Sequence, residues 1–421
     1  MRLFVGFDDG SVDVAGRFSG VGSEEFAAPF ELFDVDFILV GKASHSLRHL
    51  RALIKYYYVG IRAVMVTGDD GLTASAIARQ IGMCGSAPRV VTGPELDRMG
   101  DVELDRRISD AELLFGVAPE HKLRLVAAFQ RTGAVVAVTG DGVNDAPALK
   151  LADIGVAMGA TGSDVAREAA DMVLVDDNFA SIVAAVREGR GVYDNVRKFL
   201  TYVLTSNVPE AAAFIAFALF GVPLPLTVMQ VLAIDLGTDI LPALALGIEP
   251  PERDVMLRPP RSRGERLLDR ATIVRVYGWL GPIETVLALG GYFLVLQSGG
   301  WTPGEVLGAA SPLYREVTTA TFIGIVACQI GAVFACRTRH DSTLALPLTA
   351  NRLLLLGIAF EFALAVAVAT QPALGAALGF ASPPSHAWLF MATFAPAVVL
   401  ADEVRKAVTR RLTRPLPPTQ S

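Results

Sequence analysis

The second half of the sequence contains six long apolar stretches, and these constrain the fold more than any other feature. They run over residues 199–220, 226–248, 271–297, 316–336, 352–372 and 386–404. A helix needs roughly 20 apolar residues to cross a bilayer, and so many runs of that length cannot all be hidden in one small soluble core. The first two runs are joined only by the turn Gly-Val-Pro-Leu-Pro at 221–225, so they form a helical hairpin. We therefore predict an all-α bundle of six transmembrane helices over residues 196–406, with the lipid bilayer as its partner.

Residues 1–195 differ in composition from the apolar half. Hydrophobic residues make up 52% of the whole chain, but 19% of residues are charged, which is too polar for a protein embedded entirely in lipid. The net charge of −6 excludes a strongly basic nucleic-acid-binding protein. The three cysteines include no Cys-x-x-Cys pair, which excludes a disulfide scaffold. The chain is therefore part soluble and part membrane.

Basic residues predict the orientation. Arginine and lysine gather in the loops at 249–270 and 337–352 and in the segment that follows residue 404, whereas the alternate loops contain only Arg315. Basic residues beside short loops favour the cytoplasmic side. We expect the soluble part and a C-terminal tail, residues 407–421, to be cytoplasmic and the helices to cross the plasma membrane.

The soluble part alternates strand-like and helix-like segments. Short apolar runs at 63–66 and 134–138 each lead into a Thr-Gly-Asp sequence, and similar runs follow at 154–158 and 172–175. Helical periodicity separates them at 72–81 and 120–131. This βαβ pattern predicts a Rossmann-type α/β domain with a parallel sheet over residues 59–195 and a site at the carboxyl ends of its strands. Residues 1–58 have no such pattern and stay unassigned.

The sequence Thr-Gly-Asp-Gly-Val-Asn-Asp-Ala-Pro at 139–147 follows one of these strands directly. Asp141 and Asp145 are four residues apart around a glycine turn, an arrangement that suits Mg²⁺. Taken alone, the Asp-x-x-x-Asp spacing is a weak signal and is more typical of a solvated loop.

Three segments together resemble the phosphorylation domain of the P-type cation-transporting ATPases, which has a haloacid-dehalogenase-like fold. They are residues 139–147, Val-Thr-Gly-Asp at 66–69 and Pro-Glu-His-Lys at 119–122. The resemblance implies a catalytic set of Thr67, Gly68, Asp69 and Lys122, and a Mg²⁺ site formed by Asp141, Asn144 and Asp145. It also implies ATP as the phosphoryl donor. Phosphoryl transfer depends mainly on positioning and charge stabilisation, which these residue types can supply.

Several parts of that family's pattern are absent from this sequence. The family's nucleophile is the aspartate of Asp-Lys-Thr-Gly-Thr, and no such string occurs here. The nucleotide-binding domain, the actuator loop and the fourth transmembrane helix are missing as well. We interpret the chain as the C-terminal half of a P-type ATPase, a truncated form that is not competent in ATP-driven cation transport by itself. Two alternatives stay open: a non-catalytic membrane protein or half of a split pump completed by another polypeptide, and a membrane-tethered Mg²⁺-dependent phosphatase.

Acidic residues inside the first two apolar stretches predict a cation site. Carboxylates within a membrane are costly and are functional by default. Pro209 and Pro242 lack an N–H group, which frees backbone carbonyls for a cation. These helices most resemble the sodium/potassium-pump branch of the family, with the calcium pumps close behind, although Ala332 stands where the sodium/potassium branch has an acid. The predicted ion-transport residues are Ser206, Asn207, Glu210, Asp235, Thr238 and Asp239, together with Gln329 and Glu361, which match polar positions of later helices in that branch.

Overall fold

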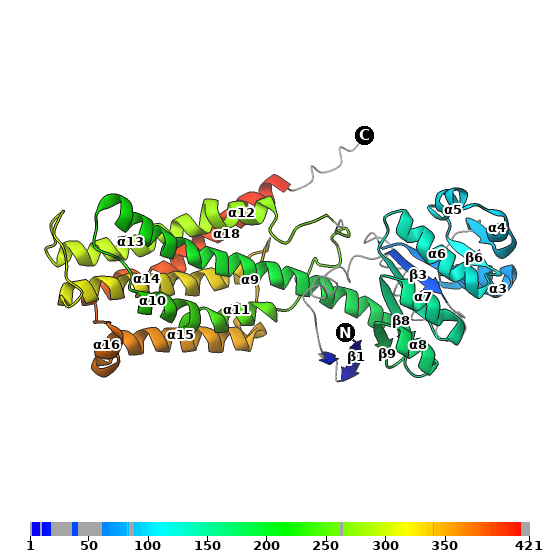
Figure 1. Ribbon diagram of the computed structural model, residues 1–421, viewed down its shortest axis with the longest axis horizontal. Helices are drawn as coiled ribbons and strands as arrows, with labels where there is room; N and C mark the ends of the chain where they lie inside the picture. The colour runs from blue at the N-terminus through cyan, green and yellow to red at the C-terminus, as the bar shows by residue number, and fades with distance from the viewer. Residues whose placement is uncertain are drawn as a thin grey trace. The chain divides into compact units, whose positions relative to one another are not determined.

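The structure is a computed structural model. It describes residues 2–8, 11–17 and 36–40 as strands, and then residues 61–81, 83, 88–261, 264–339 and 341–413. The chain divides into two compact units, Met1–Arg190 with Arg253–Glu265, and Gly191–Glu252 with Arg266–Ser421. The first unit is α/β and the second is all-α (Figure 1). The predicted order, a parallel α/β sheet domain followed by an all-α helical bundle, is confirmed.

The α/β unit is built on a nine-stranded sheet with the order β2-β1-β9-β8-β7-β3-β4-β6-β5. Neighbouring strands are parallel except β1 and β2, which pair in antiparallel fashion. The strands are β1 (Arg2–Asp8), β2 (Ser11–Arg17), β3 (Asp36–Val40), β4 (Ala63–Val66), β5 (Val90–Thr92), β6 (Leu113–Phe115), β7 (Val136–Gly140), β8 (Ile154–Met158) and β9 (Met172–Leu174). The helices of this unit are α3 (Gly71–Ile81), α4 (Gly93–Arg98), α5 (Asp101–Ile108), α6 (Pro119–Arg131), α7 (Ala146–Leu151) and α8 (Asp164–Ala169).

Both faces of the sheet are covered, which explains why its strands are continuous apolar runs. Side chains of successive strand residues point to opposite faces. Accordingly, Met65 of β4 belongs to one buried cluster, whereas Val64 and Val66 belong to the other. The residues of β7 and β8 are all buried. The sheet is therefore a rigid platform for the loops that follow its strands.

The N-terminal segment contributes strands that the sequence pattern did not reveal. The sequence pattern predicts no element within residues 1–58, but β3 pairs with both β4 and β7 and so lies between the two strands that lead into Thr-Gly-Asp. Residues 36–40 contain only four consecutive apolar residues, and periodicity alone does not distinguish so short a run from a segment of buried helix. The carboxyl ends of β3, β4 and β7 consequently meet at one edge of the sheet.

The all-α unit contains six helical spans long and apolar enough to cross a membrane, as the sequence predicted. They are Phe179–Phe220, Val228–Gly247, Arg270–Ser298, Pro312–Cys336, Arg352–Thr370 and Ser385–Leu412. The first and fourth are the continuous helices α9 (Phe179–Phe220) and α14 (Pro312–Cys336), and the fifth is α15 (Arg352–Thr370). The second span consists of α10 (Val228–Leu232), η3 (Ala233–Thr238) and α11 (Ile240–Gly247). The third span consists of α12 (Arg270–Arg275), η4 (Val276–Leu280) and α13 (Gly281–Ser298). The last span consists of α17 (Ser385–Met391) and α18 (Phe394–Thr413).

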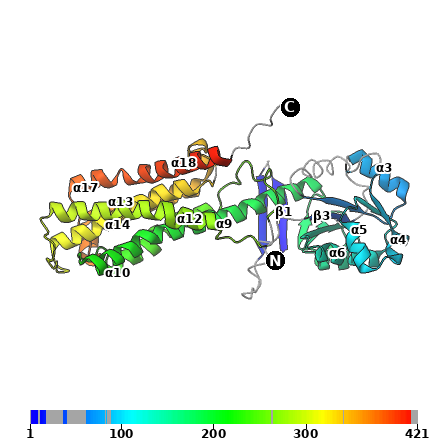
Figure 2. The same ribbon diagram turned by 90° about the horizontal axis from the view of Figure 1, so that it is seen from above.

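Helix α14 is the centre of this bundle. In its most apolar 18 residues 83% are buried, against 28–44% in the other five spans. It packs along α13 and α18, and the views agree that α13 and α14 lie side by side (Figures 1 and 2). Polar side chains on α14 are therefore shielded from lipid.

The segment η3 is a π-helix, a feature that the helical periodicity did not predict. The N–H of Asp239 donates to the carbonyl of Ile234 at 3.0 Å, which is an i to i−5 bond. Single π-helical turns are rare and concentrate at functional sites because they re-aim side chains. This one carries Asp235 and ends immediately before Asp239.

Candidate functional site

The loop after β4 is held firmly by backbone hydrogen bonds. Thr67 is buried, its N–H donates to the carbonyl of Leu114 at 2.9 Å, and its carbonyl accepts from the N–H of Val117 at 3.1 Å. The Thr67 hydroxyl oxygen accepts from the N–H of Asp69 at 3.1 Å. Gly68 is exposed and Asp69 is half-buried. The loop thus presents backbone and hydroxyl groups at the carboxyl edge of the sheet.

The structure brings two of the predicted residues, Lys122 and Asp145, into direct contact. Lys122 Nζ lies 2.5 Å from Asp145 Oδ1, and the two side chains are only 11% and 5% exposed. The other carboxylate oxygen of Asp145 accepts from the N–H of Gly142 at 3.1 Å. A Cβ on Gly140 would lie 2.5 Å from the Cβ of Asp145, so this close approach requires glycine. Asp145 therefore anchors both the loop and the lysine.

The other two predicted Mg²⁺ ligands, Asp141 and Asn144, both remain at least partly accessible to solvent. Asp141 is half-buried and Asn144 is exposed, and neither side chain has a hydrogen bond to another described residue. A carboxylate and an amide oxygen are hard donors that suit a Mg²⁺ ion retaining several water molecules. The donor set therefore fits Mg²⁺: Asp141 and Asn144 would be available as ligands, whereas Asp145 is already engaged by Lys122.

Asp70, which follows the predicted catalytic set, has a local structural role. Its carboxylate accepts from the backbone N–H groups of Leu72 and Thr73 and from the Thr73 hydroxyl, at 2.9, 3.1 and 2.7 Å. These hydrogen bonds, led by that of the Thr73 side chain, lower the pKa of Asp70. The residue caps the first turn of α3.

The predicted acids of the first two spans share one groove. A groove of about 720 Å³ in the all-α unit is lined by polar residues of α9 and of the η3–α11 span. They are Asn207, Glu210, Asp235 and Asp239, and the apolar lining includes Phe199, Phe214 and Leu244. Glu210 and Asp239 are buried, whereas Asp235 is exposed. Asp235 therefore lies at the open side of the groove, whereas Glu210 and Asp239 lie at its buried side.

Behind the groove, three other predicted polar residues, Ser206, Thr238 and Gln329, take part in hydrogen bonds, whereas Glu361 does not. Thr238 Oγ1 donates to Gln329 Oε1 at 3.2 Å, and Ser206 Oγ donates to Asp239 Oδ1 at 3.4 Å. Glu361 is fully buried, and neither of its carboxylate oxygens has a hydrogen bond to a described residue. The structure thus connects Ser206 to the acids of the groove and Gln329 to Thr238.

Sequence reasoning missed Tyr202, whose hydroxyl donates to Asp239 Oδ1 at 2.7 Å. Tyr202 is fully buried one helical turn before Ser206. Residues four apart share a helix face, and Tyr202, Ser206 and Glu210 are spaced in this way on α9. This spacing could have identified Tyr202 as a residue beside the acids.

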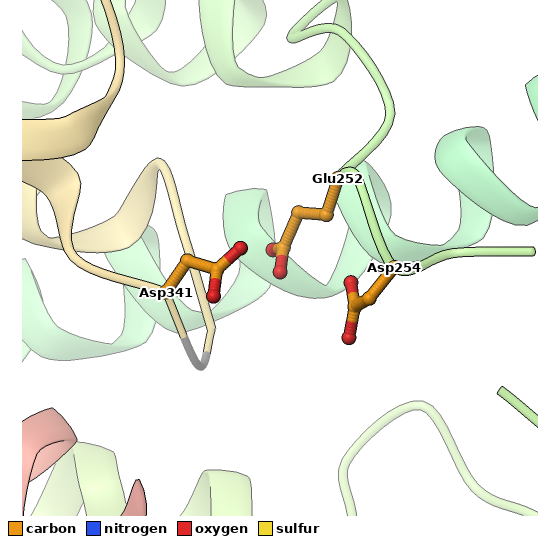
Figure 3. Close-up of side chains that lie close together, drawn as sticks. All are labelled: Glu252, Asp254 and Asp341. Carbon is orange, nitrogen blue, oxygen red and sulfur yellow. The ribbon is translucent and has the colours of Figure 1, made fainter. Parts of the chain in front are cut away.

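Two carboxylates of the all-α unit, Glu252 and Asp341, also lie close together. Their oxygens approach within 4.8 Å (Figure 3). Glu252 also lies 3.6 Å from Lys198 Nζ and accepts from the N–H of Arg339 at 3.0 Å. Its charge is therefore already neutralised, and Asp341 is exposed.

Comparisons with known proteins agree with these two regions. Residues 223–408 match the family described as "Cation transporting ATPase, C-terminus", and residues 18–153 and 123–186 match two families described as "haloacid dehalogenase-like hydrolase". The sodium/potassium-transporting ATPase subunit alpha-4 of Rattus norvegicus is 38% identical to this chain over an alignment of 413 residues. The alignment covers 86% of this chain and 40% of the relative. Subunit alpha-2 of Homo sapiens is 39% identical over 407 residues, covering 84% of this chain and 39% of the relative. The chain therefore spans about two fifths of the length of the curated relatives it matches.

Proposed function

Because this chain belongs to the P-type cation-transporting ATPase family, we propose that it supplies the Mg²⁺ loop and the later transport helices of an ATP-driven cation pump. The observation that carries this proposal is the groove that gathers Glu210, Asp235 and Asp239 inside a membrane bundle. Carboxylates are placed in a membrane to bind and move cations, and these three have no basic residue among the residues that line their groove. The donors are oxygens, which selects hard cations such as Na⁺, K⁺ or Ca²⁺.

In the α/β unit, we assign Lys122 the neutralisation of the transferred phosphoryl group. The ion pair with Asp145 holds the Lys122 ammonium group beside the loop that contains Asp141 and Asn144. Thr67 and Gly68 would donate hydrogen bonds to phosphoryl oxygens, and bound Mg²⁺ would offset the charge that develops on them. The chain's own residues thus position and neutralise the phosphoryl group.

Turnover would require an attacking carboxylate from elsewhere. The sequence contains no Asp-Lys-Thr-Gly-Thr string, and positioning alone cannot replace a nucleophile. We propose that this residue, the nucleotide site and a further helix that covers the exposed Asp235 are supplied from outside these 421 residues. The groove supports such a helix because its apolar lining, including Phe199 and Phe214, flanks the acids on an otherwise open surface. In this arrangement the α/β unit is cytoplasmic and the bundle lies in the plasma membrane.

The cation site is tested on the purified full chain in lipid nanodiscs. Thermal unfolding is followed while Na⁺, K⁺ or Ca²⁺ is titrated, because a ligand that binds only the folded state raises the midpoint. The parent should be stabilised by at least one of these cations, and Asp239→Asn should lose that response. Asp341→Asn, which removes an exposed carboxylate outside the groove, is the matched control and should respond like the parent. Equal responses of parent and Asp239→Asn would refute the site.

The catalytic part is tested with radiolabelled ATP. The purified chain with Mg²⁺ should form no acid-stable phosphoenzyme. Co-purification with a polypeptide that contains Asp-Lys-Thr-Gly-Thr should restore phosphorylation, on that polypeptide and not on this chain. Aspartyl phosphate on this chain alone would contradict the proposal.

A further inference from the structure

Asp177, in the turn between β9 and α9, has an unusual backbone conformation. Its φ is +51°, and among the described residues it is the single non-glycine residue with a positive φ. Glycine adopts this left-handed region freely, and asparagine and aspartate do so more readily than other residues. Strained backbone of this kind persists where the surrounding contacts fix it, and it concentrates at functional sites. The contacts of the Asp177 side chain therefore indicate what the conformation serves.

The Asp177 carboxylate binds the loop of residues 159–163, which follows β8, the neighbour of β9 in the sheet (Figure 1). Oδ1 accepts from the N–H of Ala160 at 2.9 Å, and Oδ2 accepts from the N–H and the hydroxyl of Thr161 at 2.8 and 2.6 Å. Burial raises the pKa of Asp177, but the hydrogen bonds from Thr161 and Ala160 outweigh burial and lower the pKa. The carboxylate is therefore ionised at neutral pH, and charge-assisted hydrogen bonds tie the loop to the turn.

The loop 159–163 has little room to move. A Cβ on Gly159 would lie 2.6 Å from the carbonyl oxygen of Leu174, and a Cβ on Gly162 would overlap a backbone carbonyl, so both close approaches require glycine. The Arg167 side chain on α8 donates to the carbonyls of both glycines, at 2.9 and 2.6 Å. Because the loop is held as one piece, fixing its first residues also fixes its last ones.

The far end of this loop contacts the predicted Mg²⁺ ligand Asp141. The N–H of Ser163 donates to the backbone carbonyl of Asp141 at 2.8 Å. Ser163 is itself fixed as the N-cap of α8, since its side-chain oxygen accepts from the N–H of Ala166 at 3.2 Å. A hydrogen bond to the backbone of a residue restrains the direction in which its side chain points. The contacts therefore run from Asp177 through the loop to Asp141.

We infer that Asp177 is a positioning residue for Mg²⁺, which acts through the loop 159–163 to hold Asp141 in the orientation that the ion requires. This inference rests on the proposed function of the loop after β7 as a Mg²⁺ site. Mg²⁺ demands near-octahedral geometry, so its affinity is sensitive to the direction of each ligand. Partners that orient a metal ligand typically change metal affinity by about 10- to 100-fold when they are removed.

Asp177→Asn breaks the contact with little change of the backbone, because asparagine also adopts a positive φ. Its amide has one acceptor oxygen and one N–H₂ donor, and so cannot accept every bond that the carboxylate accepts. Thr161→Val removes only the hydroxyl bond, whereas Thr161→Ser keeps it. Asp176→Asn is the matched control, because the side chain of this neighbouring aspartate accepts from the N–H of Asn178 and the hydroxyl of Ser181 instead.

The probe is Mn²⁺, a substitute for Mg²⁺ whose free form is measured by electron paramagnetic resonance. It is titrated into the purified full chain in nanodiscs of neutral phosphatidylcholine. The loop site is the Mn²⁺ that excess Mg²⁺ displaces and that Asp141→Asn loses. Asp177→Asn should bind as many Mn²⁺ ions at saturation as the parent, with an about tenfold higher half-saturating concentration, because the ligands are present but less well oriented. Thr161→Val should shift in the same direction, and Thr161→Ser and Asp176→Asn should bind like the parent.

The affinity separates positioning from a merely structural role. A structural role would lower the thermal midpoint of Asp177→Asn and leave the half-saturating concentration unchanged, and that result would overturn the inference. If Asp177→Asn does not fold, Thr161→Val decides, and parent-like affinity in that variant would be equally decisive against it. If neither variant folds, both residues are structural and the inference is wrong.

Asp141→Asn distinguishes this failure from failure of the proposed function. If Asp141→Asn loses a Mn²⁺ ion while Asp177→Asn binds like the parent, the Mg²⁺ site stands and only the positioning role falls. If Asp141→Asn binds Mn²⁺ like the parent, the proposed Mg²⁺ site falls, and the role of Asp177 falls with it.

Discussion

The hydroxyl of Tyr202 donates a 2.7 Å hydrogen bond to Asp239 Oδ1, and this bond ties α9 to the end of the π-helical segment η3. Ser206 donates to the same oxygen at 3.4 Å. The other oxygen, Oδ2, has no hydrogen bond within the described chain. Tyr202 and Ser206 therefore fix the orientation of the Asp239 carboxylate through Oδ1 and leave Oδ2 available for a cation.

Tyr202→Phe should weaken cation binding without abolishing it. Partners that orient a ligand typically change metal affinity by about tenfold or more when they are removed. We expect the half-saturating cation concentration in thermal-shift titrations to rise by about that factor. The free energy of unfolding should fall by roughly 1–3 kcal/mol because a buried hydrogen bond to a carboxylate is lost.

Tyr292→Phe is the control for this prediction. Tyr292 is equally buried, and its hydroxyl donates to the carbonyl of Pro223 at 2.6 Å, away from the acids. Its replacement should lower stability by a similar amount and leave the cation titration unchanged. A shift in the titration of both variants alike would show that Tyr202 acts only through general stability.

Lys122→Gln should loosen the loop after β7. The lysine and Asp145 are nearly buried together, so removing the cation leaves a carboxylate supported only by the N–H of Gly142. Breaking such a pair from one side destabilises by about 3–5 kcal/mol. Hydrogen–deuterium exchange followed by mass spectrometry should show faster exchange at 140–146. Lys150→Gln, at an exposed position on α7, should leave the exchange of this segment as in the parent.

The sequence predicted the elements that are dictated by local periodicity. The apolar run 154–158 is β8 with the same bounds, and the six apolar stretches are six helical spans. Strand β7 begins two residues later than the run 134–138, at Val136, and it ends two residues later because the Thr-Gly that follows continues the sheet pairing. The clustering of Glu210 with Asp239 could be predicted because acids buried in a membrane seek common partners.

Features that arise from packing between distant segments could not be predicted. The central place of β3 depends on its pairing with β4 and β7, and nothing within residues 36–40 specifies those partners. The π-helical turn at Asp235 shifts the register between Asp235 and Asp239 relative to an α-helix. The ion pair of Lys122 with Asp145 joins residues 23 positions apart, on α6 and in the loop before α7.

Asp402→Asn should destabilise the bundle strongly. Asp402 is fully buried and lies 2.8 Å from Arg275, 2.7 Å from Arg405 and 3.0 Å from Lys406. Neutralising it would leave the buried Arg275 and Lys406 without their shared carboxylate, at a cost of about 3–5 kcal/mol. The thermal midpoint in nanodiscs should fall, while Asp341→Asn should differ little from the parent. An unchanged midpoint for Asp402→Asn would show that the carbonyl of Ala335, which accepts from both cations at 2.9 Å, suffices.

Asp269, the residue before α12, should make stability depend on pH in the acid range. Burial raises the pKa of this carboxyl, but hydrogen bonds from the side chain and N–H of Thr272 and the charge and hydrogen bond of Arg339 outweigh burial and lower the pKa to about 2. The unfolded chain has the ordinary value of 3.8. Because the folded value is the lower one, the stabilisation is complete above the unfolded pKa and is lost as pH falls through the folded pKa.

Asp269→Asn isolates this charge effect, because asparagine caps a helix about as well as aspartate. The variant should be less stable than the parent by roughly 1–2 kcal/mol at pH 7, a value reduced from the full shift because the carboxylate is partly exposed. The difference should shrink between pH 4 and pH 2, where the parent's carboxylate takes up its proton. Unfolding in denaturant at a series of pH values measures both quantities. A difference that persists undiminished at pH 2 would mean that Asp269 stabilises the helix by its shape and hydrogen bonds and not by its charge.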